Sequence, residues 1–477
     1  MKDSSYKHIF KYTGLFGSVQ ALNILIGLVR NKVIAMILGP VGVGLISVYN
    51  TAATLIQNST NFGLQMSGVR EISQAFDAKD EEATNKYVSL LRSWSLFAAL
   101  LGFAVCLAMS GVLSMWAFSS FEHTLHFALL SIVVAMAAIT GGETAILKAT
   151  RKLKQLAKTS VAGVFFALVV SVPLFLRWKY DGIIPSLIII GFIQMVIVMW
   201  YSCRYYPLHL MRKWHNLREG KSMITIGTAF VLAGVFGSGA EFAVRAYLSE
   251  MSVSLAGLYN AGYMITMTYA GMVFAAMETD YYPFLSAVCG DTVKMNGAVN
   301  RQIEVSIMIV APMLVALMFG LQILIPLLFS GKFLPVIGMT QITVIAMYFR
   351  AVNLPVAYIM LAKGDSKSYL MMESVYDVLI VLTIIFGYNN WGLDGTGIAL
   401  AVTSFVDCMC VLGYCTWKYD LELSERLLKY ISVQLVLGLI SLAIVNYTAG
   451  ISYYALGTVM LAISAYVSYR MYKQTVK

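Results

Sequence analysis

The sequence predicts an all-α polytopic membrane protein with about fourteen transmembrane helices. Three observations indicate this fold class: 59% of the 477 residues are hydrophobic, only 12% are charged, and long apolar stretches recur along the chain. A typical soluble domain is about 45–50% apolar and about 25% charged, and a soluble protein of this size could not cover its surface with so few charges. The composition therefore excludes a soluble enzyme, a disulfide-bonded secreted scaffold and a disordered chain.

Fourteen apolar stretches approach or exceed the roughly 20 residues that a helix needs to cross a bilayer. In chain order we expect them at 12–38, 42–66, 87–111, 125–148, 159–176, 183–203, 222–247, 255–278, 303–329, 336–362, 369–388, 395–417, 428–446 and 451–472. The connections between them are too short for a soluble catalytic domain. No catalytic constellation, metal motif or cofactor motif is found, so we expect neither an enzyme nor a bound cofactor or metal. His123 and His126, in and beside an external connection, are expected to be solvated rather than to form a metal site.

The distribution of Lys and Arg predicts the orientation. With the N-terminus in the cytoplasm, 26 of the 34 basic residues lie in or beside cytoplasmic connections and 3 in external connections. This asymmetry predicts an even number of spans and cytoplasmic termini. The net charge of +10 is therefore a topology signal, and no nucleic-acid partner is implied. Two basic connections, 148–160 and 204–221, are either ordinary loops or interfacial helices on anionic headgroups.

A weak internal repeat predicts two related halves. The chain matches itself at a shift of 210 residues, and an even number of spans per half gives both halves the same orientation. The matching pairs are Lys11 and Lys221, Gly17 and Gly227, Leu22 and Leu232, Gly27 and Gly237, Val43 and Val253, Leu45 and Leu255, and Tyr49-Asn50 and Tyr259-Asn260. We expect six-helix lobes at 1–211 and 212–420, with an appended transmembrane hairpin at 421–477. Such a bundle would enclose a central cavity.

Polar residues form stripes on the first two spans of each half. Residues three and four positions apart share one face of a helix. The stripes are Gln20, Asn23, Gly27 and Arg30; Asn50, Thr54, Gln57 and Asn61; Gly234, Ser238, Glu241 and Arg245; and Tyr259, Tyr263 and Thr266, with Asn260 beside them. Each stripe could serve as interhelical hydrogen-bonding contacts. Their recurrence at matching places favours a cavity lining.

Basic residues inside predicted spans are candidates for anion binding, because each costs about 2.5–3.5 kcal/mol near the middle of a bilayer. Arg30 and Arg350 have no obvious partner on their own helices. Arg245 is spaced four residues from Glu241, so these two either form an ion pair or face the cavity separately.

Acidic residues inside predicted spans are candidates for ion coupling. Glu373 and Asp377 share one helix face and lie one span before Asp407. Together they could form a proton or sodium site, or they could pair with Lys363 or Lys367 or lie at the membrane interface. Glu241 is a further candidate.

Several motifs resemble a known family. The run 28-LVRNKVIAMILGPVGVGLISVYN-50 resembles the start of polysaccharide flippases in the multidrug/oligosaccharidyl-lipid/polysaccharide (MOP) exporter superfamily. The stretches 16-FGSVQALNILIGLVRNK-32 and 62-FGLQMSGVREIS-73 are similar to O-antigen translocases of the Wzx type. Further similar pieces are 255-LAGLYNAGYMI-265, 280-DYYPFLSAV-288 and 329-FSGKFLPV-336.

The resemblance implies two six-helix lobes forming a V around a cationic cavity, as in multidrug and toxic compound extrusion (MATE) transporters of that superfamily. It implies an undecaprenyl-pyrophosphate-linked oligosaccharide (an O-antigen or capsule-type repeat unit) as the substrate, moved from the cytoplasmic to the periplasmic leaflet of the bacterial inner membrane by alternating access. Proton or sodium coupling, membrane lipids and glycan polymerase or assembly partners are implied as well. The cationic lining carried over favours Arg30 and Arg245, with Arg350 weaker. With this substrate, the Asn, Gln and Tyr side chains of the polar stripes could donate and accept hydrogen bonds with sugar hydroxyls.

Three alternatives stay open. Fourteen spans also suit a lipid II flippase, although the motifs favour it less. A drug/cation antiporter of the same superfamily would need a cavity dominated by acids. A membrane-embedded glycan polymerase would be expected to have a large periplasmic loop, and every external connection here is short.

Overall fold

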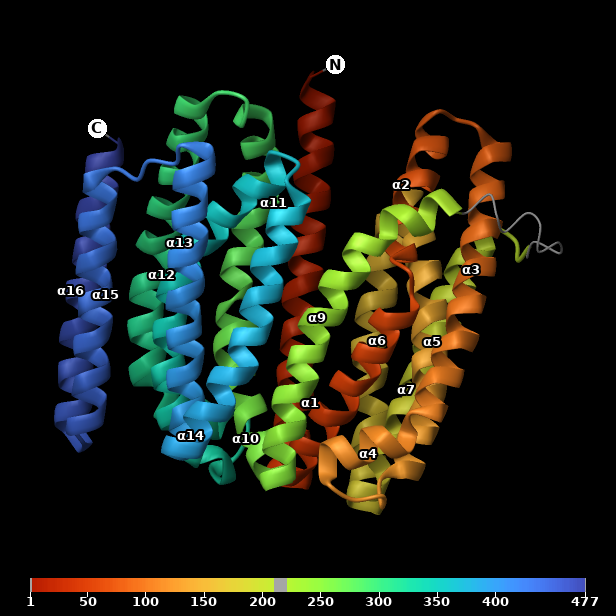
Figure 1. Cartoon of the computed structure of the whole chain (residues 1–477), viewed down its shortest axis with the longest axis horizontal. Helices are drawn as coiled ribbons and strands as arrows, with labels where there is room; N and C mark the ends of the chain where they lie inside the picture. The colour runs from red at the N-terminus through yellow and green to blue at the C-terminus, as the bar shows by residue number, and fades with distance from the viewer. Residues whose placement is uncertain (1, 210–220, 477) are drawn as a thin grey trace. The chain divides into compact units, whose positions relative to one another are not determined.

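The computed structural model describes residues 2–209 and 221–476, and the side chains of residues 22–209, 231–274 and 281–474. These residues form helices joined by short turns, and no strand occurs among them (Figure 1). Within the described residues, ten stretches are long and apolar enough to cross a membrane. Three of them, with 39, 53 and 54 residues, are long enough for two crossings each. The predicted all-α multi-span fold is confirmed.

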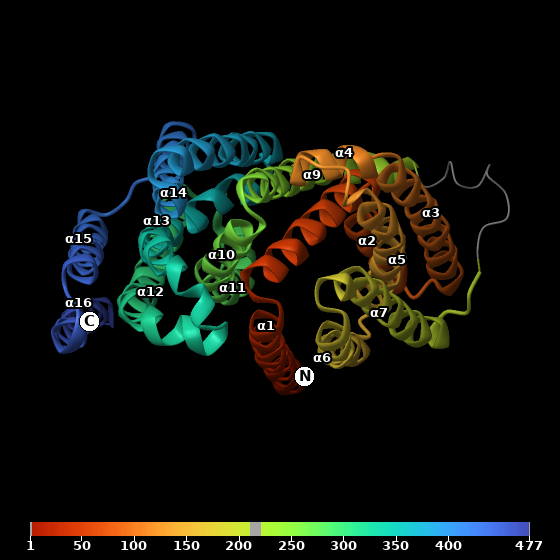
Figure 2. The same ribbon diagram turned by 90° about the horizontal axis from the view of Figure 1, so that it is seen from below.

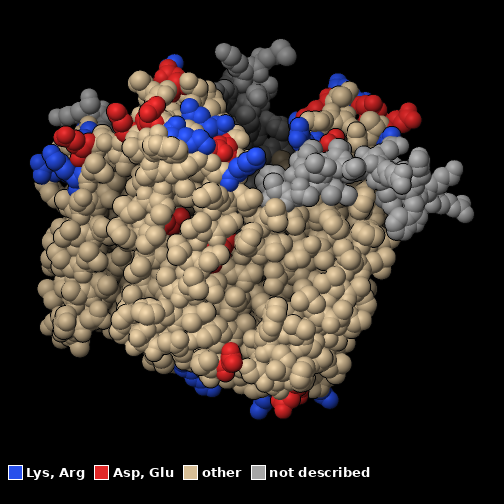
Figure 3. Space-filling view, viewed as in Figure 1, with Lys and Arg blue, Asp and Glu red and all other residues tan. Residues whose placement is uncertain are grey.

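Most charged side chains on the visible face of each unit gather at the helix ends, and the broad band between them carries few charges, with small recessed acidic patches (Figure 3). Such a band matches a bilayer interior, where an exposed charge is costly. Together with the ten apolar stretches, it makes the chain a multi-pass membrane protein.

The chain divides into two compact units, residues 1–257 and 258–477. Unit 1 contains α1 (Lys2–Thr60), α2 (Leu64–Asp77), α3 (Glu81–Ala108), α4 (Ser110–Phe118), α5 (Thr124–Ala149), α6 (Leu153–Trp178), η1 (Lys179–Gly182), α7 (Ile183–Tyr205) and α9 (Lys221–Met251). The helix α10 (Val253–Tyr263) crosses from one unit to the other. Unit 2 continues with η3 (Met264–Ala270), α11 (Met272–Val288), α12 (Thr292–Leu328), η4 (Gly331–Val336), α13 (Ile337–Ala362), α14 (Ser366–Tyr419), α15 (Glu425–Tyr447) and α16 (Gly450–Val476).

In unit 1, α1 bends sharply and its two halves correspond to the first two predicted spans (Figure 2). Gly39 has a φ of 64°, a region open to glycine, and Pro40 follows it without a backbone N–H to continue the ladder. The second half of α1 packs against α9, where Asn58 Nδ2 donates to the Gly234 carbonyl at 3.2 Å. The break between α9 and α10, at Ser252, lies 210 residues after Gly42 and so falls beside the matching bend of the predicted repeat.

One predicted boundary and one predicted connection in unit 1 are corrected by the structure. The second span, expected to reach residue 66, ends with α1 at Thr60, because the chain turns through Phe62 and Gly63 with positive φ. The expected connection 67–86 contains most of the amphipathic helix α2, which packs on α3 and α5 through buried residues that include Ile72.

The two basic connections do not form the same kind of structure. Segment 148–160 is not an interfacial helix of its own, because α5 ends at Ala149 and α6 begins at Leu153. Most of segment 204–221 lies outside the described residues.

In unit 2, α14 folds back on itself at Trp391 and Gly392, so its halves supply two predicted spans. The α15–α16 hairpin packs on α12 and shares the unit's apolar core, through buried residues that include Leu427, Val445 and Tyr453. The division at residue 257 follows packing, whereas the expected lobes 1–211 and 212–420 and hairpin 421–477 rest on the repeat. Those lobe boundaries stay a prediction.

Candidate functional site

The first half of α1 presents Asn23, Gly27 and Arg30 at spacings of four and three residues, on one face of the helix. Asn23 Nδ2 donates to Ser160 Oγ on α6 at 2.7 Å. The Asn23 Oδ1 and the guanidinium Nε of Arg30 are buried and have no hydrogen-bond partner among the described residues. A Cβ at Gly27, between Asn23 and Arg30 on this face, would meet no atom within 4 Å, so the helix surface is open there. The face therefore offers a cation and an amide oxygen beside that space.

Arg30 has no acidic neighbour on the two helices that pack together around it. From residue 22 to its end, α1 contains no Asp or Glu, and α6, which packs against α1, contains none along its whole length. No ion pair of Arg30 is found among the described residues. Arg30 is half-buried, and neither helix supplies a carboxylate to compensate its charge.

The other predicted sugar-contacting residues of unit 1 differ in placement. Asn50 and Thr54 are exposed on the second half of α1, and Gln57 is half-buried on the same helix. Asn61 lies beyond the end of α1, where its Oδ1 accepts a hydrogen bond from the Gly63 backbone N–H at 2.7 Å. Asn61 is therefore part of a turn and does not continue the helical stripe. The side chain of Gln20 lies outside the described residues.

Arg245 and Glu241 form the ion pair that their spacing on α9 suggested. Arg245 Nη1 lies 3.4 Å from Glu241 Oε2 and donates to the Glu241 carbonyl at 3.2 Å. The Arg245 side chain is 6% exposed and that of Glu241 is 48% exposed. Arg245 therefore has a carboxylate partner that Arg30 lacks.

A second group of charged side chains lies inside unit 2, on α13 and α14. The Asp407 carboxylate accepts a hydrogen bond from Asn353 Nδ2 at 2.5 Å, and the charges of Glu373 and Arg350 act on it. Arg350 Nη1 also lies 3.6 Å from Met267 Sδ, in the π-helical element η3. The structure thus brings together three predicted residues, Arg350, Glu373 and Asp407. Sequence reasoning missed Asn353, although its spacing of three from Arg350 places both on one helix face.

The remaining predicted residues of unit 2 are packed within it. Tyr259 is buried on α10, with its ring centroid 5.9 Å from that of Tyr263. Asn260 Nδ2 approaches Met264 Sδ at 3.5 Å. Asp377, one turn after Glu373 on α14, also has interaction partners. These placements leave the predicted roles of the four predicted residues untested.

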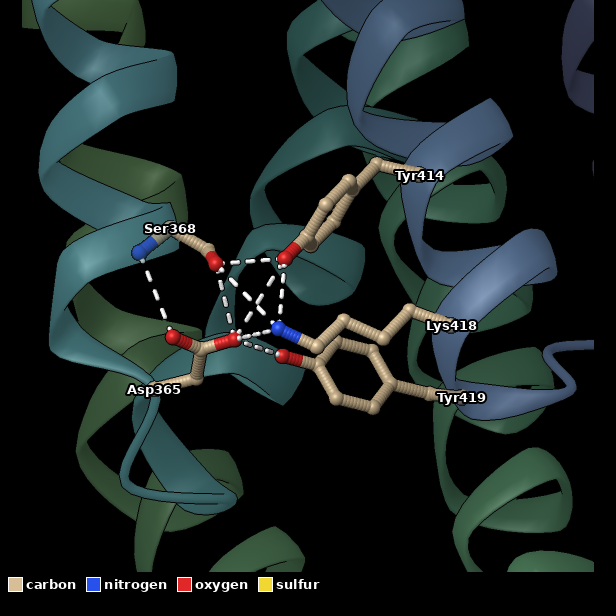
Figure 4. Close-up of polar contacts among 5 residues, drawn as sticks. All are labelled: Asp365, Ser368, Tyr414, Lys418 and Tyr419. Carbon is tan, nitrogen blue, oxygen red and sulfur yellow. Dashed lines mark hydrogen bonds and ion pairs between the residues drawn. The ribbon is translucent and has the colours of Figure 1, made fainter.

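The two ends of α14 are joined by a polar clasp that the sequence did not predict (Figure 4). Asp365 Oδ2 accepts hydrogen bonds from Lys418 Nζ at 2.5 Å, Tyr419 Oη at 2.6 Å and Ser368 Oγ at 2.8 Å. Asp365 also caps α14 by accepting from the Ser368 backbone N–H, and Tyr414 Oη contacts Ser368 Oγ. The hydrogen bonds from Lys418, Tyr419 and Ser368 hold the pKa of Asp365 well below its usual range.

We expect Asp365→Asn to lower the melting temperature of the purified protein, because the amide loses the charge that pairs with Lys418. Hydrogen bonds to charged groups contribute about 1.5–3 kcal/mol when buried, and this partly exposed carboxylate should contribute less. Since its folded pKa is depressed, the stabilisation is present above the ordinary carboxyl pKa of about 3.9 and is lost progressively as the pH falls from there toward the lower folded pKa. The measurement is the melting temperature of both proteins from pH 7 to 3.

The control for this prediction is Asp291→Asn, since Asp291 caps α12 through Val293 and Lys294 on an exposed surface. It should shift the melting temperature less. A difference between wild type and Asp365→Asn that does not shrink at low pH would contradict the assignment.

The comparison with protein families decides the identity of the chain at the level of a family. A family model described as polysaccharide biosynthesis protein matches residues 9–338, which is more than half of the sequence. The chain belongs to this family. No curated protein matches its sequence.

Solved structures show that this polysaccharide biosynthesis protein has the MOP-superfamily fold. A lipid II flippase MurJ in an inward closed conformation aligns with a TM-score of 0.74 and 11% identity, covering 97% of this chain and 99% of that one. An inward-facing MATE-family multidrug resistance transporter aligns with a TM-score of 0.70 and 14% identity, covering 83% and 94%. A MOP superfamily transporter from Pyrococcus furiosus aligns with a TM-score of 0.60 and 13% identity, covering 86% and 96%. The resemblance to MOP-type polysaccharide flippases is confirmed.

Proposed function

We propose that this family member is a flippase for a lipid-linked oligosaccharide, with undecaprenyl pyrophosphate as the carrier and an O-antigen or capsule-type repeat unit as the cargo. It would move the glycan from the cytoplasmic to the periplasmic leaflet of the bacterial inner membrane by alternating access. Family membership supports a role in polysaccharide biosynthesis, and the fold supports a membrane transporter.

The observation that carries the proposal is the half-buried guanidinium of Arg30, which forms no ion pair with the residues that the structure describes. A buried charge without a partner is strongly destabilising, and a charge in a membrane span costs more when nothing pairs with it. A diphosphate would supply the missing anion, because its oxygens match the planar fork of an arginine. The open space at Gly27 and the free Oδ1 of Asn23 then leave room and an acceptor for the first sugar.

The other predicted residues take secondary roles in this proposal. Arg245 would contribute to phosphate attraction only when its pair with Glu241 opens, since that pair satisfies it at rest. Arg350 would act mainly as the counterion of Asp407 and Glu373. These two acids, with Asp377, are proposed to exchange a proton or Na⁺ during the cycle, and Asn353 would hold Asp407 in place.

We expect Arg30→Gln to abolish surface glycan export while the protein is still expressed and inserted. The amide keeps a polar side chain but cannot neutralise a diphosphate, and Arg30→Lys should retain part of the activity as a point charge. The measurement is surface glycan in cells whose only translocase is the variant, normalised to the amount of protein in the membrane.

Lys32→Gln is the matched control for Arg30→Gln. Lys32 lies two residues further along the same helix, about 200° around its axis, so it should not face the same space. Full export by both Arg30→Gln and Arg245→Gln would rule out the phosphate-binding role of these arginines.

A lipid II flippase is the second candidate. The match to MurJ spans 97% of this chain, against 83–86% for the two other transporters described above, so it extends over more of the chain's length. Complementation of a conditional lipid II flippase mutant tests this candidate directly. Growth of the complemented cells would identify lipid II, and not the lipid-linked oligosaccharide, as the substrate. Failure to grow with normal expression would exclude this candidate.

A further inference from the structure

Three polar atoms of unit 1 converge at the end of the helices that the sequence places on the external side. Tyr49 Oη, in the second half of α1, lies 2.8 Å from His123 Nδ1 and 3.2 Å from His126 Nδ1. The two histidine nitrogens lie 3.2 Å from each other. Tyr49 is 2% exposed, and both histidines are half-buried and contact its hydroxyl, in place of the full solvation that the sequence suggested. The cluster joins α1 to the start of α5.

Hydrogen bonding alone does not satisfy this triangle. An imidazole nitrogen carries either one N–H or one lone pair, and the phenol has one proton. No protonation state therefore gives all three contacts a linear hydrogen bond. A cation, by contrast, can accept a lone pair from all three atoms at once.

The size of the triangle fits a metal ion. Nitrogen and oxygen ligands bind Zn²⁺ at about 2.0–2.2 Å in a tetrahedron, which places the ligand atoms roughly 3.3–3.5 Å apart. The three sides observed, 2.8, 3.2 and 3.2 Å, approach that edge and need only a small expansion. We propose that Tyr49, His123 and His126 form a binding site for a divalent transition-metal ion of the zinc class.

The surroundings hold the ligands in place. Phe118 stacks on the His123 ring with centroids 4.1 Å apart, and Phe127 meets the Tyr49 ring edge-on at 5.3 Å. Such contacts fix ring orientation, as outer-shell groups do in metal sites. Glu122, next in the chain, acts on His123 electrostatically and adds negative charge. No group of three His, Cys, Asp or Glu side chains suited to a metal is found in the described part of the chain, so the third ligand here is a phenol oxygen.

The site would strengthen one end of unit 1. The turn between α4 and α5 is already tied to α9, because Ser119 Oγ donates to Glu250 Oε1 at 2.9 Å. A metal on Tyr49, His123 and His126 would tie the same turn to α1. The two imidazole nitrogens suit Zn²⁺, Cu²⁺ and Ni²⁺, whereas Mg²⁺ and Ca²⁺ prefer sites made of oxygen ligands alone.

The test uses the full-length purified protein, with any affinity tag removed and metal stripped by a chelator. Zn²⁺ is titrated by calorimetry, and Co²⁺ is added as a spectroscopic probe of tetrahedral coordination. We expect one ion per chain, a rise in melting temperature that saturates with Zn²⁺, and no such response to Mg²⁺.

Variants identify the ligands. Tyr49→Phe keeps the packed ring and removes only the oxygen, while His126→Gln removes one nitrogen. Each should weaken binding by more than the roughly 10–100-fold typical of outer-shell changes. His209→Gln is the control, because His209 is exposed and contacts only the Pro207 carbonyl among the described residues. Zn²⁺ binding that is absent, or equal in wild type and the His123→Gln/His126→Gln double variant, would overturn the proposal.

Discussion

Replacing Arg92 by methionine is expected to cause a large loss of folded protein, because it leaves Glu143 as an unpaired carboxylate inside unit 1. Arg92 Nε and Nη2 bind the two carboxylate oxygens of Glu143 at 2.7 and 3.0 Å. The two side chains are 3% and 4% exposed. Arg92 also donates from Nη1 to the Pro207 carbonyl at 2.8 Å, which fixes the chain just after α7. Removing one partner of such a pair typically costs about 3–5 kcal/mol.

A double variant distinguishes two causes of the lost stability: the unpaired buried charge of Glu143 and the loss of the contacts made by Arg92. Arg92→Met/Glu143→Leu removes both charges and should recover much of the stability that Arg92→Met loses, because apolar replacements of a buried pair are often neutral. Arg151→Met is the control: Arg151 and Asp77 are also 2.7 Å apart, but their side chains are 67% and 50% exposed. That exposed pair should contribute about 0–1 kcal/mol. Melting temperatures and the yield of monodisperse protein in detergent give the comparison, and a double variant as unstable as Arg92→Met would exclude charge burial as the cause.

The Arg92–Glu143 ion pair could not be predicted from the sequence. The Glu241–Arg245 pair could be suggested from the sequence, because four residues on a helix bring two side chains to the same face. Arg92 and Glu143 are 51 residues apart, and Asp365 and Lys418 are 53 apart. Their pairing depends on which helices pack together, which a single sequence does not state.

The membrane spans were predictable for a different reason. Hydropathy and length are local properties, so the long apolar stretches of α12 and α13 indicated helices before their packing was known. The helix α2 was missed because its 14 residues are too few and too polar to resemble a span. Its role depends on the face that it buries against α3 and α5.

The candidate site was predictable only in part. The spacing of Asn23 and Arg30 indicated one helix face, and the structure places both on α1. In the second span, Asn61 continues the helical spacing of Asn50, Thr54 and Gln57. The helix nevertheless ends one residue before Asn61, and the Asn61 carboxamide accepts a hydrogen bond within a turn. Asn353 was missed because its partner, Asp407, lies on another helix.

Substituting Gly257 by alanine should disrupt unit 1, because the added Cβ would overlap the backbone carbonyl of Pro40. The contact is reciprocal: a Cβ at Gly44 would overlap the carbonyl of Val253. The bend of α1 and the start of α10 therefore meet backbone to backbone. Helices in a bilayer gain little from the hydrophobic effect, so close approach at small residues supplies much of their packing energy. A backbone atom cannot rotate away, so the helices must separate, at a cost of about 1–3 kcal/mol or more.

Alanine at Gly413 should have the opposite effect on stability. Gly413 is exposed in the helical interior of α14, and an added Cβ would meet nothing within 4 Å. Alanine is favoured over glycine there by up to about 1 kcal/mol, because it reduces the freedom of the unfolded chain. Gly257→Ala should therefore lower the melting temperature and Gly413→Ala should keep or raise it. Equal melting temperatures for the two variants would mean that the α1–α10 contact is loose enough to admit a methyl group, and the close backbone approach would then not be what holds the two helices together.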